Sequence, residues 1–206
     1  MPAVWTPPAN TRALIFDCDG TLADTMPIHY KAWQKILPPR GIPFGEKRFY
    51  QLGGMPTAKI IELLSAETGV PVDNVEALVA EKESHFLSLL HEVKPLAEVV
   101  EIAARYRGKL PIAVATGGYR SVIEQTLGII GILDWFDASV CAEDTARHKP
   151  EPDVFLEAAK RLGNIPPQLC VVFEDTDIGL EAARRAGMTG VDVRPWFPPR
   201  FGESFQ

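Results

Sequence analysis

Two aspartates separated by a single residue follow the first apolar run of the chain, in the sequence ALIFDCDG at residues 13–20. While the backbone stays extended, the side chains of Asp17 and Asp19 leave the same face, and their Cα atoms lie roughly 7 Å apart. One carboxylate of such a pair can act as a nucleophile or metal ligand while the other exchanges a proton. A solvated Asp-Gly turn, with Gly20 easing the bend, explains the same residues equally well. A catalytic interpretation of this pair therefore needs further evidence from the rest of the chain.

Other predicted strand ends carry residues that suit the same chemistry. Thr116 follows IAVA, Lys149 lies in HKPEPD, and Glu174 with Asp175 follows CVVF. Because the carboxyl ends of parallel strands converge on one edge of a sheet, we expect these groups to surround the aspartate pair. A hydroxyl, an ammonium and several carboxylates are what an anionic phosphoryl group and a divalent cation together require.

Each of these residues also has a purely structural interpretation. Lys149 could be a solvated loop lysine, but the prolines at positions 150 and 152 fix the backbone around it and favour a functional role. Thr116 could simply finish its strand, but the two glycines that follow it allow a ligand to approach the backbone. We interpret Asp177 as a helix cap and not as a metal ligand.

The elements that must position these residues alternate between strand and helix, which indicates an α/β fold with a parallel sheet. Short apolar runs and amphipathic patterns mark them. The expected strands are 13–17, 112–116, 138–141, 170–174 and 190–193, and the expected helices between them are 96–106, 121–127, 152–162 and 178–186.

The stretch from residue 25 to about 91 differs, because it shows helical periodicity and no convincing strand. Its expected helices are 28–37, 58–68 and 75–90. We therefore predict an all-helical cap domain, residues 23–92, inserted into an α/β core of residues 1–22 and 93–206. Such a unit, held by two linkers, is well placed to cover the carboxyl edge of the sheet.

The composition restricts the function classes. The chain has 206 residues, 46% of them hydrophobic, with a net charge of −6 and no basic run, so we expect no nucleic-acid partner. No stretch approaches the roughly 18 apolar residues of a membrane span, and the opening residues lack the apolar segment of a secretory signal. We expect a cytoplasmic protein with its three cysteines reduced, no membrane partner, and a monomer as the default.

Four motifs in this order, DCDGT, VATGG, HKPEPD and FEDTDIG, resemble those of the haloacid dehalogenase-like phosphatase superfamily, and the resemblance covers nearly the whole chain. It implies a Rossmann-like core, and the helical insertion resembles the small C1-type cap of that superfamily. EKESHFLSLLHEVKPL, CVVFEDTDIGLEAARRAGM and GVDVR resemble the subgroup that contains bacterial fructose-1-phosphate phosphatases and β-phosphoglucomutases.

The resemblance implies roles for the core residues. Asp17 would form an aspartyl-phosphate, and Asp19 would protonate the leaving alcohol and then activate water. Mg²⁺ would be held by the Asp17 carboxylate, the Asp19 main-chain carbonyl and Asp175, with Glu174 beside it.

The same resemblance assigns the groups that bind the phosphoryl oxygens. Lys149 would supply a second cation and bridge toward Asp17. The Thr116 hydroxyl and the Gly117 amide would hold phosphoryl oxygens, and Gly118 would complete that substrate-binding loop.

Four cap residues resemble substrate contacts of the relatives. His29, in DTMPIHYKAW, stands where β-phosphoglucomutases also carry a histidine, although a lone histidine is usually structural. Lys82 resembles a cap lysine, with a solvated helix face as the alternative. Gly54 and Thr57 resemble the substrate-recognition loop. β-Phosphoglucomutase carries an arginine at the Thr57 position, where it binds a second phosphate. Because this chain has a threonine instead, the resemblance disfavours a mutase.

The sequence therefore predicts magnesium-dependent hydrolysis of a small sugar phosphate, with fructose 1-phosphate as a candidate. Asp19 points to phosphate esters, because a carbon–halogen hydrolase has no leaving alcohol to protonate. A phosphosugar mutase and a binding module without turnover are the alternatives. A cysteine-dependent phosphatase loop, from the C-x5-R spacing of Cys141 and Arg147, is disfavoured by the two acidic residues inside it.

Overall fold

The core of the protein is a five-stranded parallel sheet with the strand order β3-β2-β1-β4-β5. The computed structural model describes residues 5–53 and 55–197. The sheet confirms the predicted α/β class. Its strands are β1 (Ala13–Phe16), β2 (Ile112–Ala115), β3 (Ala138–Val140), β4 (Cys170–Glu174) and β5 (Thr189–Asp192).

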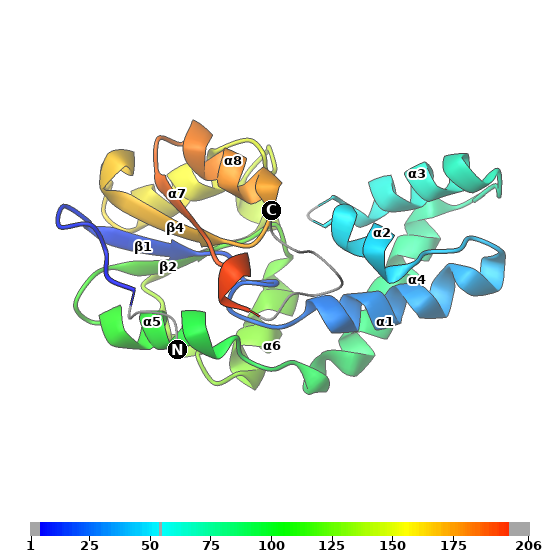
Figure 1. Ribbon diagram of the computed structural model, residues 1–206, viewed down its shortest axis with the longest axis horizontal. Helices are drawn as coiled ribbons and strands as arrows, with labels where there is room; N and C mark the ends of the chain where they lie inside the picture. Colours follow the sequence, from blue (N-terminus) through cyan, green and yellow to red (C-terminus); the bar gives the residue numbers. More distant parts are fainter. Residues whose placement is uncertain (1–4, 54, 198–206) are drawn as a thin grey trace.

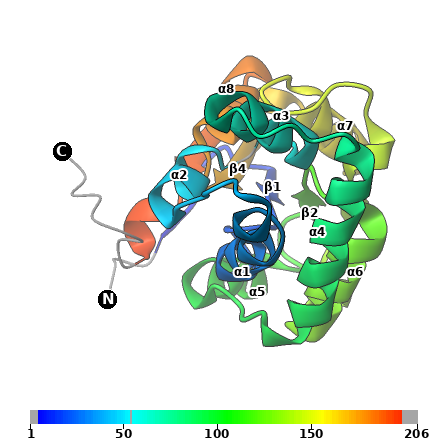
Figure 2. The ribbon, with the colours of Figure 1, turned by 90° about the vertical axis from the view of Figure 1, so that its right-hand side faces the viewer.

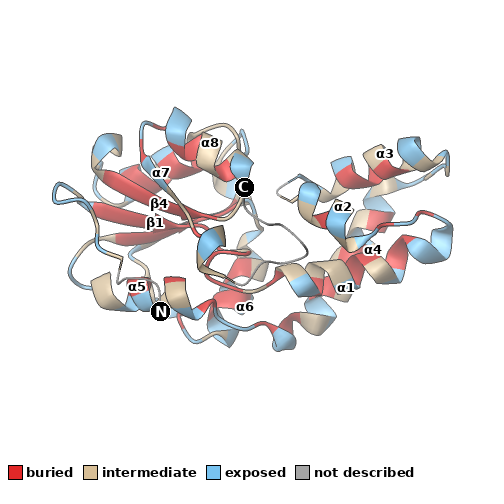
Figure 3. Cartoon of the chain, in the orientation of Figure 1, coloured by how far each residue is buried: buried red, intermediate tan, exposed pale blue. Residues whose placement is uncertain are grey.

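The central strands form because they are short apolar runs that are covered on both faces, as parallel sheets require. Every residue of β1, β2 and β4 is buried. Leu14 of β1 is in register with Ile112 of β2 on one side and with Val171 of β4 on the other. Figure 3 shows this buried layer through the middle of the core.

Two layers of helices cover the sheet, one on each face (Figures 1 and 2). Side chains alternate along a strand, so Leu14 and Phe16 pack with the helices on one face while Ala13 and Ile15 pack with those on the other. The first face carries α5 (Ala97–Tyr106) and α6 (Arg120–Ile129), and the second carries α7 (Asp153–Arg161) and α8 (Asp177–Arg185).

The helical insertion contains four helices in its described residues and has a hydrophobic cluster of its own. The helices are α1 (Met26–Ile36), α2 (Glu46–Gln51), α3 (Thr57–Thr68) and α4 (Val75–Leu89). Trp33 and Ile36 of α1, Ile61 of α3 and Leu78 of α4 are buried in that cluster. The sequence did not indicate α2, because a helix of six residues is too short to show a period. Single 3-10 turns occupy Pro38–Arg40, Leu90–Glu92, Leu133–Trp135, Ala142–Asp144, Pro167–Leu169 and Arg194–Trp196.

Two chain segments join the insertion to the core, and they run antiparallel beside each other. Ala23 forms an antiparallel bridge with Pro95. The Asp24 amide donates to the Lys94 carbonyl at 2.8 Å, and the Leu96 amide donates to the Leu22 carbonyl at 2.9 Å. This crossing lies close to the predicted boundaries, and the division into a core and a cap of residues 23–92 stays our proposal.

Two further observations concern the predicted surroundings of the protein. In the described part of the chain, the helices are too short or too polar to cross a lipid bilayer. Cys18, Cys141 and Cys170 are free and buried.

Candidate active site

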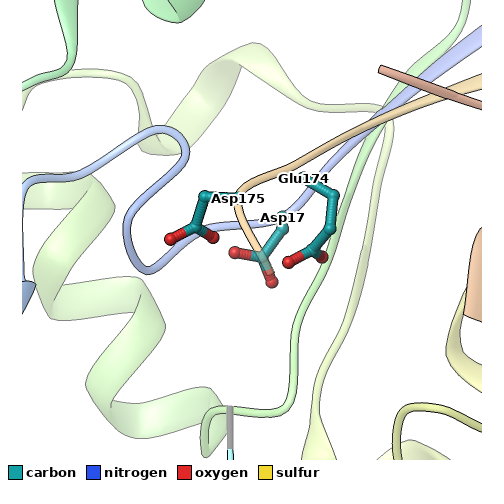
Figure 4. A group of neighbouring side chains, drawn as sticks. All are labelled: Asp17, Glu174 and Asp175. Carbon is teal, nitrogen blue, oxygen red and sulfur yellow. The ribbon is translucent and has the colours of Figure 1, made fainter. Parts of the chain in front are cut away.

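The residues singled out in the core meet at the carboxyl edge of the three central strands. Asp17 directly follows β1, Thr116 directly follows β2, and Glu174 ends β4. The strand pairing continues to these positions, since the Asp17 amide donates to Phe173 and the Thr116 amide donates to Val140, both at 3.0 Å. In Figure 4 the carboxylates of Asp17, Glu174 and Asp175 point toward one another.

Lys149 joins two of these carboxylates. Its Nζ lies 2.6 Å from Asp17 Oδ1 and 2.7 Å from Glu174 Oε2, and its side chain is only 10% exposed. Burial alone would lower the pKa of Lys149, but Asp17 and Glu174 raise it above its usual value. The lysine is therefore a fixed positive charge beside the predicted nucleophile, and its interpretation as a solvated loop lysine is wrong.

The carboxylates carry more negative charge than Lys149 can balance. Burial, together with Glu174, raises the pKa of Asp17 to about 7 against the opposing effect of Lys149. Burial, with Glu174 and Asp17 adding to it, also raises the pKa of Asp175 well above its usual value. Three carboxylates facing one ammonium leave two negative charges in a buried site, and a buried charge is costly unless it is compensated.

These residues fit a divalent cation. Asp17, Glu174 and Asp175 each offer an oxygen, and these oxygens lie within 4.8 Å of one another. Carboxylate oxygens are the ligands that Mg²⁺ prefers, and its two positive charges match the excess. Gly20 makes room for this arrangement, because it has a φ of +81° and a Cβ there would lie 2.1 Å from Asp175 Oδ2.

Threonines that sequence reasoning missed hold two of the carboxylates. Thr21 donates from Oγ1 to Asp175 Oδ1 at 3.2 Å. Thr176 donates to Glu174 Oε1 from its amide at 3.1 Å and from Oγ1 at 2.7 Å. Both threonines lie inside the quoted motifs DCDGT and FEDTDIG, so their position next to the acidic residues was the available signal.

Thr176 also caps α8, which corrects the interpretation of Asp177. The Thr176 side chain accepts a hydrogen bond from the Gly179 amide at 3.1 Å. Asp177 is instead the first residue of the helix, and its Oδ1 lies 2.8 Å from Arg194 Nη2. A hydroxyl one residue earlier satisfies the free amide of the first turn, so the aspartate is not needed as a cap.

Asp19 faces the cap. Its Oδ1 lies 3.9 Å from His29 Nε2, and this buried oxygen has no hydrogen-bond partner within the described residues. Burial would raise the pKa of Asp19, but His29 and Lys82 lower it below its usual value. Asp19 is therefore a carboxylate with an unused acceptor, held between the core and the first cap helix.

The loop after β2 lies beside this carboxylate. The Thr116 hydroxyl accepts a hydrogen bond from the Gly118 amide at 3.1 Å, so its own proton remains available to a ligand. A Cβ at Gly118 would lie 2.7 Å from Ile123 and 3.5 Å from Asp19 Oδ2, whereas one at Gly117 would meet nothing within 4 Å. The roles assigned to Thr116 and both glycines stay predictions.

Two of the predicted cap residues contact each other. The Lys82 Nζ lies 2.8 Å from His29 Nδ1 and 2.9 Å from Glu83 Oε1. Lys82 is only 2% exposed, so its interpretation as part of a solvated helix face is wrong. The Thr57 Oγ1 donates to the same Glu83 oxygen at 3.3 Å. Gly54 lies outside the described residues.

Cys141 and Arg147 do not form a phosphate-binding loop. Cys141 is 1% exposed, and burial raises the pKa of its thiol to about 11. Arg147 Nη2 lies 2.9 Å from Asp153 Oδ2. A protonated thiol is a weak nucleophile, and an arginine already paired with a carboxylate offers little to phosphate.

Comparison with known proteins places this arrangement in a family. Residues 11–187 match the family model described as haloacid dehalogenase-like hydrolase. The chain is 42% identical over 182 residues to the fructose-1-phosphate phosphatase YqaB of Escherichia coli strain K12, covering 88% of this chain and 95% of the relative. It is 32% identical over 180 residues to a phosphorylated carbohydrates phosphatase of Thermotoga maritima, covering 86% of this chain and 82% of the relative.

A similar fold occurs among solved structures. A β-phosphoglucomutase from Clostridium difficile superposes with a TM-score of 0.78 and 27% sequence identity. The match covers 88% of this chain and 84% of the other chain. The resemblance extends over the sheet and the helical insertion together, since it leaves little of either chain unmatched.

Proposed function

This chain belongs to the haloacid dehalogenase-like hydrolase family, and we propose that it hydrolyses the phosphate monoester of a small sugar, with fructose 1-phosphate as the first substrate to test. The observation that carries the proposal is the cluster of Asp17, Glu174, Asp175 and Lys149 at the carboxyl edge of the sheet. The choice of a sugar phosphate as the substrate class is supported by the names of the phosphatase relatives.

Asp17 is the proposed nucleophile. Lys149 binds Oδ1, which leaves Oδ2 to attack phosphorus. A bond then forms between Asp17 and phosphorus while the bond from phosphorus to the sugar oxygen breaks. The attack brings like charges together, at a cost of about 4 kcal/mol per charge pair at 4 Å with an effective dielectric constant near 20. Lys149 opposes this repulsion because it stays protonated at neutral pH.

Asp19 is the proposed acid and base. It gives a proton to the departing sugar oxygen, so the alcohol leaves neutral. It then takes a proton from the water molecule that attacks the aspartyl-phosphate, which releases inorganic phosphate and restores Asp17. The position of Asp19 supports this role, because its side chain is 28% exposed and faces the cap beside His29, where a substrate can reach it.

The cation in this proposal is Mg²⁺. The Asp17 and Asp175 carboxylates and the Asp19 main-chain carbonyl would hold it, with Glu174 beside it. When bound, Mg²⁺ supplies positive charge that lowers the repulsion between the nucleophile and the phosphoryl oxygens. Thr21 and Thr176 orient two of the surrounding carboxylates through their hydrogen bonds to Asp175 and Glu174.

The phosphoryl oxygens would be held by the loop after β2. The Thr116 hydroxyl and the Gly117 amide donate to these oxygens, with Gly118 keeping the loop close to Asp19. His29, Lys82 and Thr57 would face the sugar from the cap. We also propose that the protein acts in the cytoplasm and as a monomer, and its free, buried cysteines fit a reducing compartment.

A phosphosugar mutase is the second candidate, because the chain is 29% identical over 190 residues to the β-phosphoglucomutase of Bacillus subtilis, covering 88% of this chain and 83% of the relative. Thr57 and Glu83 disfavour it, because a hydroxyl paired with a carboxylate offers no cation to a second phosphate. The discriminating assay is conversion of β-glucose 1-phosphate to glucose 6-phosphate in the presence of a sugar bisphosphate. Absence of conversion under these conditions removes the mutase.

Phosphate release from a panel of sugar monophosphates tests the main proposal. We expect turnover that requires Mg²⁺, stops on chelation and returns when Mg²⁺ is added back. Asp17→Asn should abolish it while leaving the melting temperature close to that of the wild type. No magnesium-dependent turnover on any member of the panel would refute the proposal and favour a binding module without catalysis.

A further inference from the structure

Glu83, on α4, connects three helices of the cap. Its Oε1 accepts hydrogen bonds from Lys82 Nζ at 2.9 Å and from Thr57 Oγ1 at 3.3 Å. Thr57 is the first residue of α3, and Lys82 contacts His29 of α1. In Figure 1, α1 and α3 both begin on the side of the cap that is nearer the core. The Glu83 carboxylate therefore belongs to the part of the cap that can meet a substrate.

A continuous series of contacts leads from the proposed acid to Glu83. Asp19 Oδ1 lies 3.9 Å from His29, His29 lies 2.8 Å from Lys82, and Lys82 lies 2.9 Å from Glu83. Allowing for the width of the imidazole ring, these contacts keep the two carboxylates within about 12 Å of each other. With bond lengths near 1.5 Å, an extended six-carbon sugar spans about 6 Å, and a hydrogen bond adds about 3 Å. A sugar whose reacting oxygen lies at Asp19 can therefore reach Glu83 with its far end.

Glu83 has an acceptor to spare. Both of its hydrogen bonds go to Oε1, and Oε2 receives none from the residues that the structure describes. The side chain is 31% exposed, so it is partly accessible to a ligand. A carboxylate accepts hydrogen bonds and donates none, so the ligand group that fits Oε2 is a hydroxyl.

The charge at this end of the site opposes a second phosphate. Lys82 is buried, and its positive charge is already neutralised by Glu83. A phosphoryl group placed here would meet a carboxylate and an ammonium that is committed to that carboxylate. The core end differs, because Lys149 and the proposed cation are there to receive a phosphoryl group.

We propose that Glu83 is a specificity-determining residue, which accepts a hydrogen bond from the sugar hydroxyl farthest from the reacting phosphate and, by its charge, rejects sugar bisphosphates. The inference rests on the proposed phosphatase function and narrows its substrate class to monophosphates of polyhydroxylated sugars. Glu83 does not touch the reacting atoms, so its effect is on which substrate is accepted.

The test compares three substrates: a ketohexose 1-phosphate, the 1,6-bisphosphate of the same sugar, and phenyl phosphate, which has no hydroxyls. Values of kcat/KM are measured for the wild type, Glu83→Gln and Glu83→Asp. Glu81→Gln is the matched control, because it removes the same charge from the same helix at a residue that pairs with Arg40.

We expect the wild type to prefer the monophosphate, and Glu83→Gln to reduce that preference over the bisphosphate by about tenfold. The kcat/KM of Glu83→Gln for phenyl phosphate should differ from that of the wild type by less than twofold. Glu81→Gln should behave as the wild type on all three substrates. Glu83→Asp keeps the negative charge but moves the carboxylate oxygens away from the sugar. It should therefore still reject the bisphosphate, while its kcat/KM for the monophosphate should fall severalfold.

Two results would overturn the inference while leaving the proposed function intact. One is an active Glu83→Gln variant with an unchanged preference. The other is a variant that melts as the wild type does but loses activity on all three substrates alike, which assigns Glu83 to the core chemistry and not to the choice of substrate. A wild-type protein that releases phosphate from none of the substrates would refute the proposed function, and the inference with it. Thermal melting of each variant shows whether it is folded.

Discussion

Lys149→Met is the substitution that tests the charge arrangement of the core most directly. It removes an ammonium that lies 2.6 Å from Asp17 and 2.7 Å from Glu174, and it keeps a side chain of similar length against Phe155. Because the lysine is 10% exposed, the carboxylates it leaves behind are buried without compensation. Breaking a buried pair in this way costs about 3 to 5 kcal/mol of unfolding free energy. At about 2 to 4 °C per kcal/mol for a chain of this size, we expect a melting temperature lower by about 10 °C.

The same substitution should change the rate and its pH dependence. Loss of one fixed positive charge beside a reacting phosphoryl group lowers kcat by about 10² to 10³-fold. With Lys149 present, the pKa of Asp17 in the metal-free protein is about 7, and Lys149 holds it down. Removing the lysine raises that pKa further. Since the nucleophile must be deprotonated, the acidic limb of the rate profile should move to higher pH.

The assay is phosphate release between pH 5.5 and 9 at a Mg²⁺ concentration below saturation, where protonation of metal-free Asp17 affects the rate, with melting curves recorded on the same samples. Lys160→Met serves as the control, because Lys160 is a 68% exposed lysine paired with Glu157 on the surface of α7. A Lys149→Met variant within fivefold of wild-type activity at pH 7, with an unmoved acidic limb, would refute the electrostatic role given to this lysine.

Three further outcomes are expected. Asp19→Asn should lower kcat by about 10² to 10⁴-fold with little change in melting temperature, and full activity in steady-state assays would contradict its role as acid and base. Gly20→Ala should weaken Mg²⁺ binding at least tenfold by calorimetry, because its Cβ would lie 2.1 Å from Asp175 Oδ2 in a turn with φ of +81°, and wild-type affinity would show that the turn yields easily. Mg²⁺ affinity should rise with pH through about 7, because burial raises the pKa of Asp17 to about 7 and that of Asp175 well above its usual value, and protons compete with the cation for both carboxylates; an affinity independent of pH between 5.5 and 7 would contradict this.

Much of the fold could be predicted because its signals are local. Each core strand is a short apolar run flanked by turn residues. The limits of β4 are those predicted, and no limit of the other strands differs from its prediction by more than one residue. The chemistry-bearing positions come directly after these runs, so parallel topology alone brings Asp17, Thr116 and Glu174 to one edge. Family resemblance was needed to assign roles to them, and those roles stay predictions.

The parts that could not be predicted depend on distant contacts. The α2 helix has no period of its own and is held by the buried Phe49. Lys82 looks like a surface residue in the sequence, yet Trp33 of α1 covers it together with Phe86, one turn farther along its own helix. The sequence did not indicate a role for Glu83, because its hydrogen bond to Thr57 joins residues that lie 26 positions apart in the chain.

The antiparallel crossing at Ala23 and Pro95 has a mechanical consequence. Two hydrogen-bonded segments resist twisting better than one, so the crossing favours rotation of the helical unit about a single axis over a free swivel. His29 follows the crossing by only a few residues and is displaced little by such a rotation. The contact between His29 and Asp19 is therefore the part of the boundary between the helical unit and the core that such a rotation disturbs least.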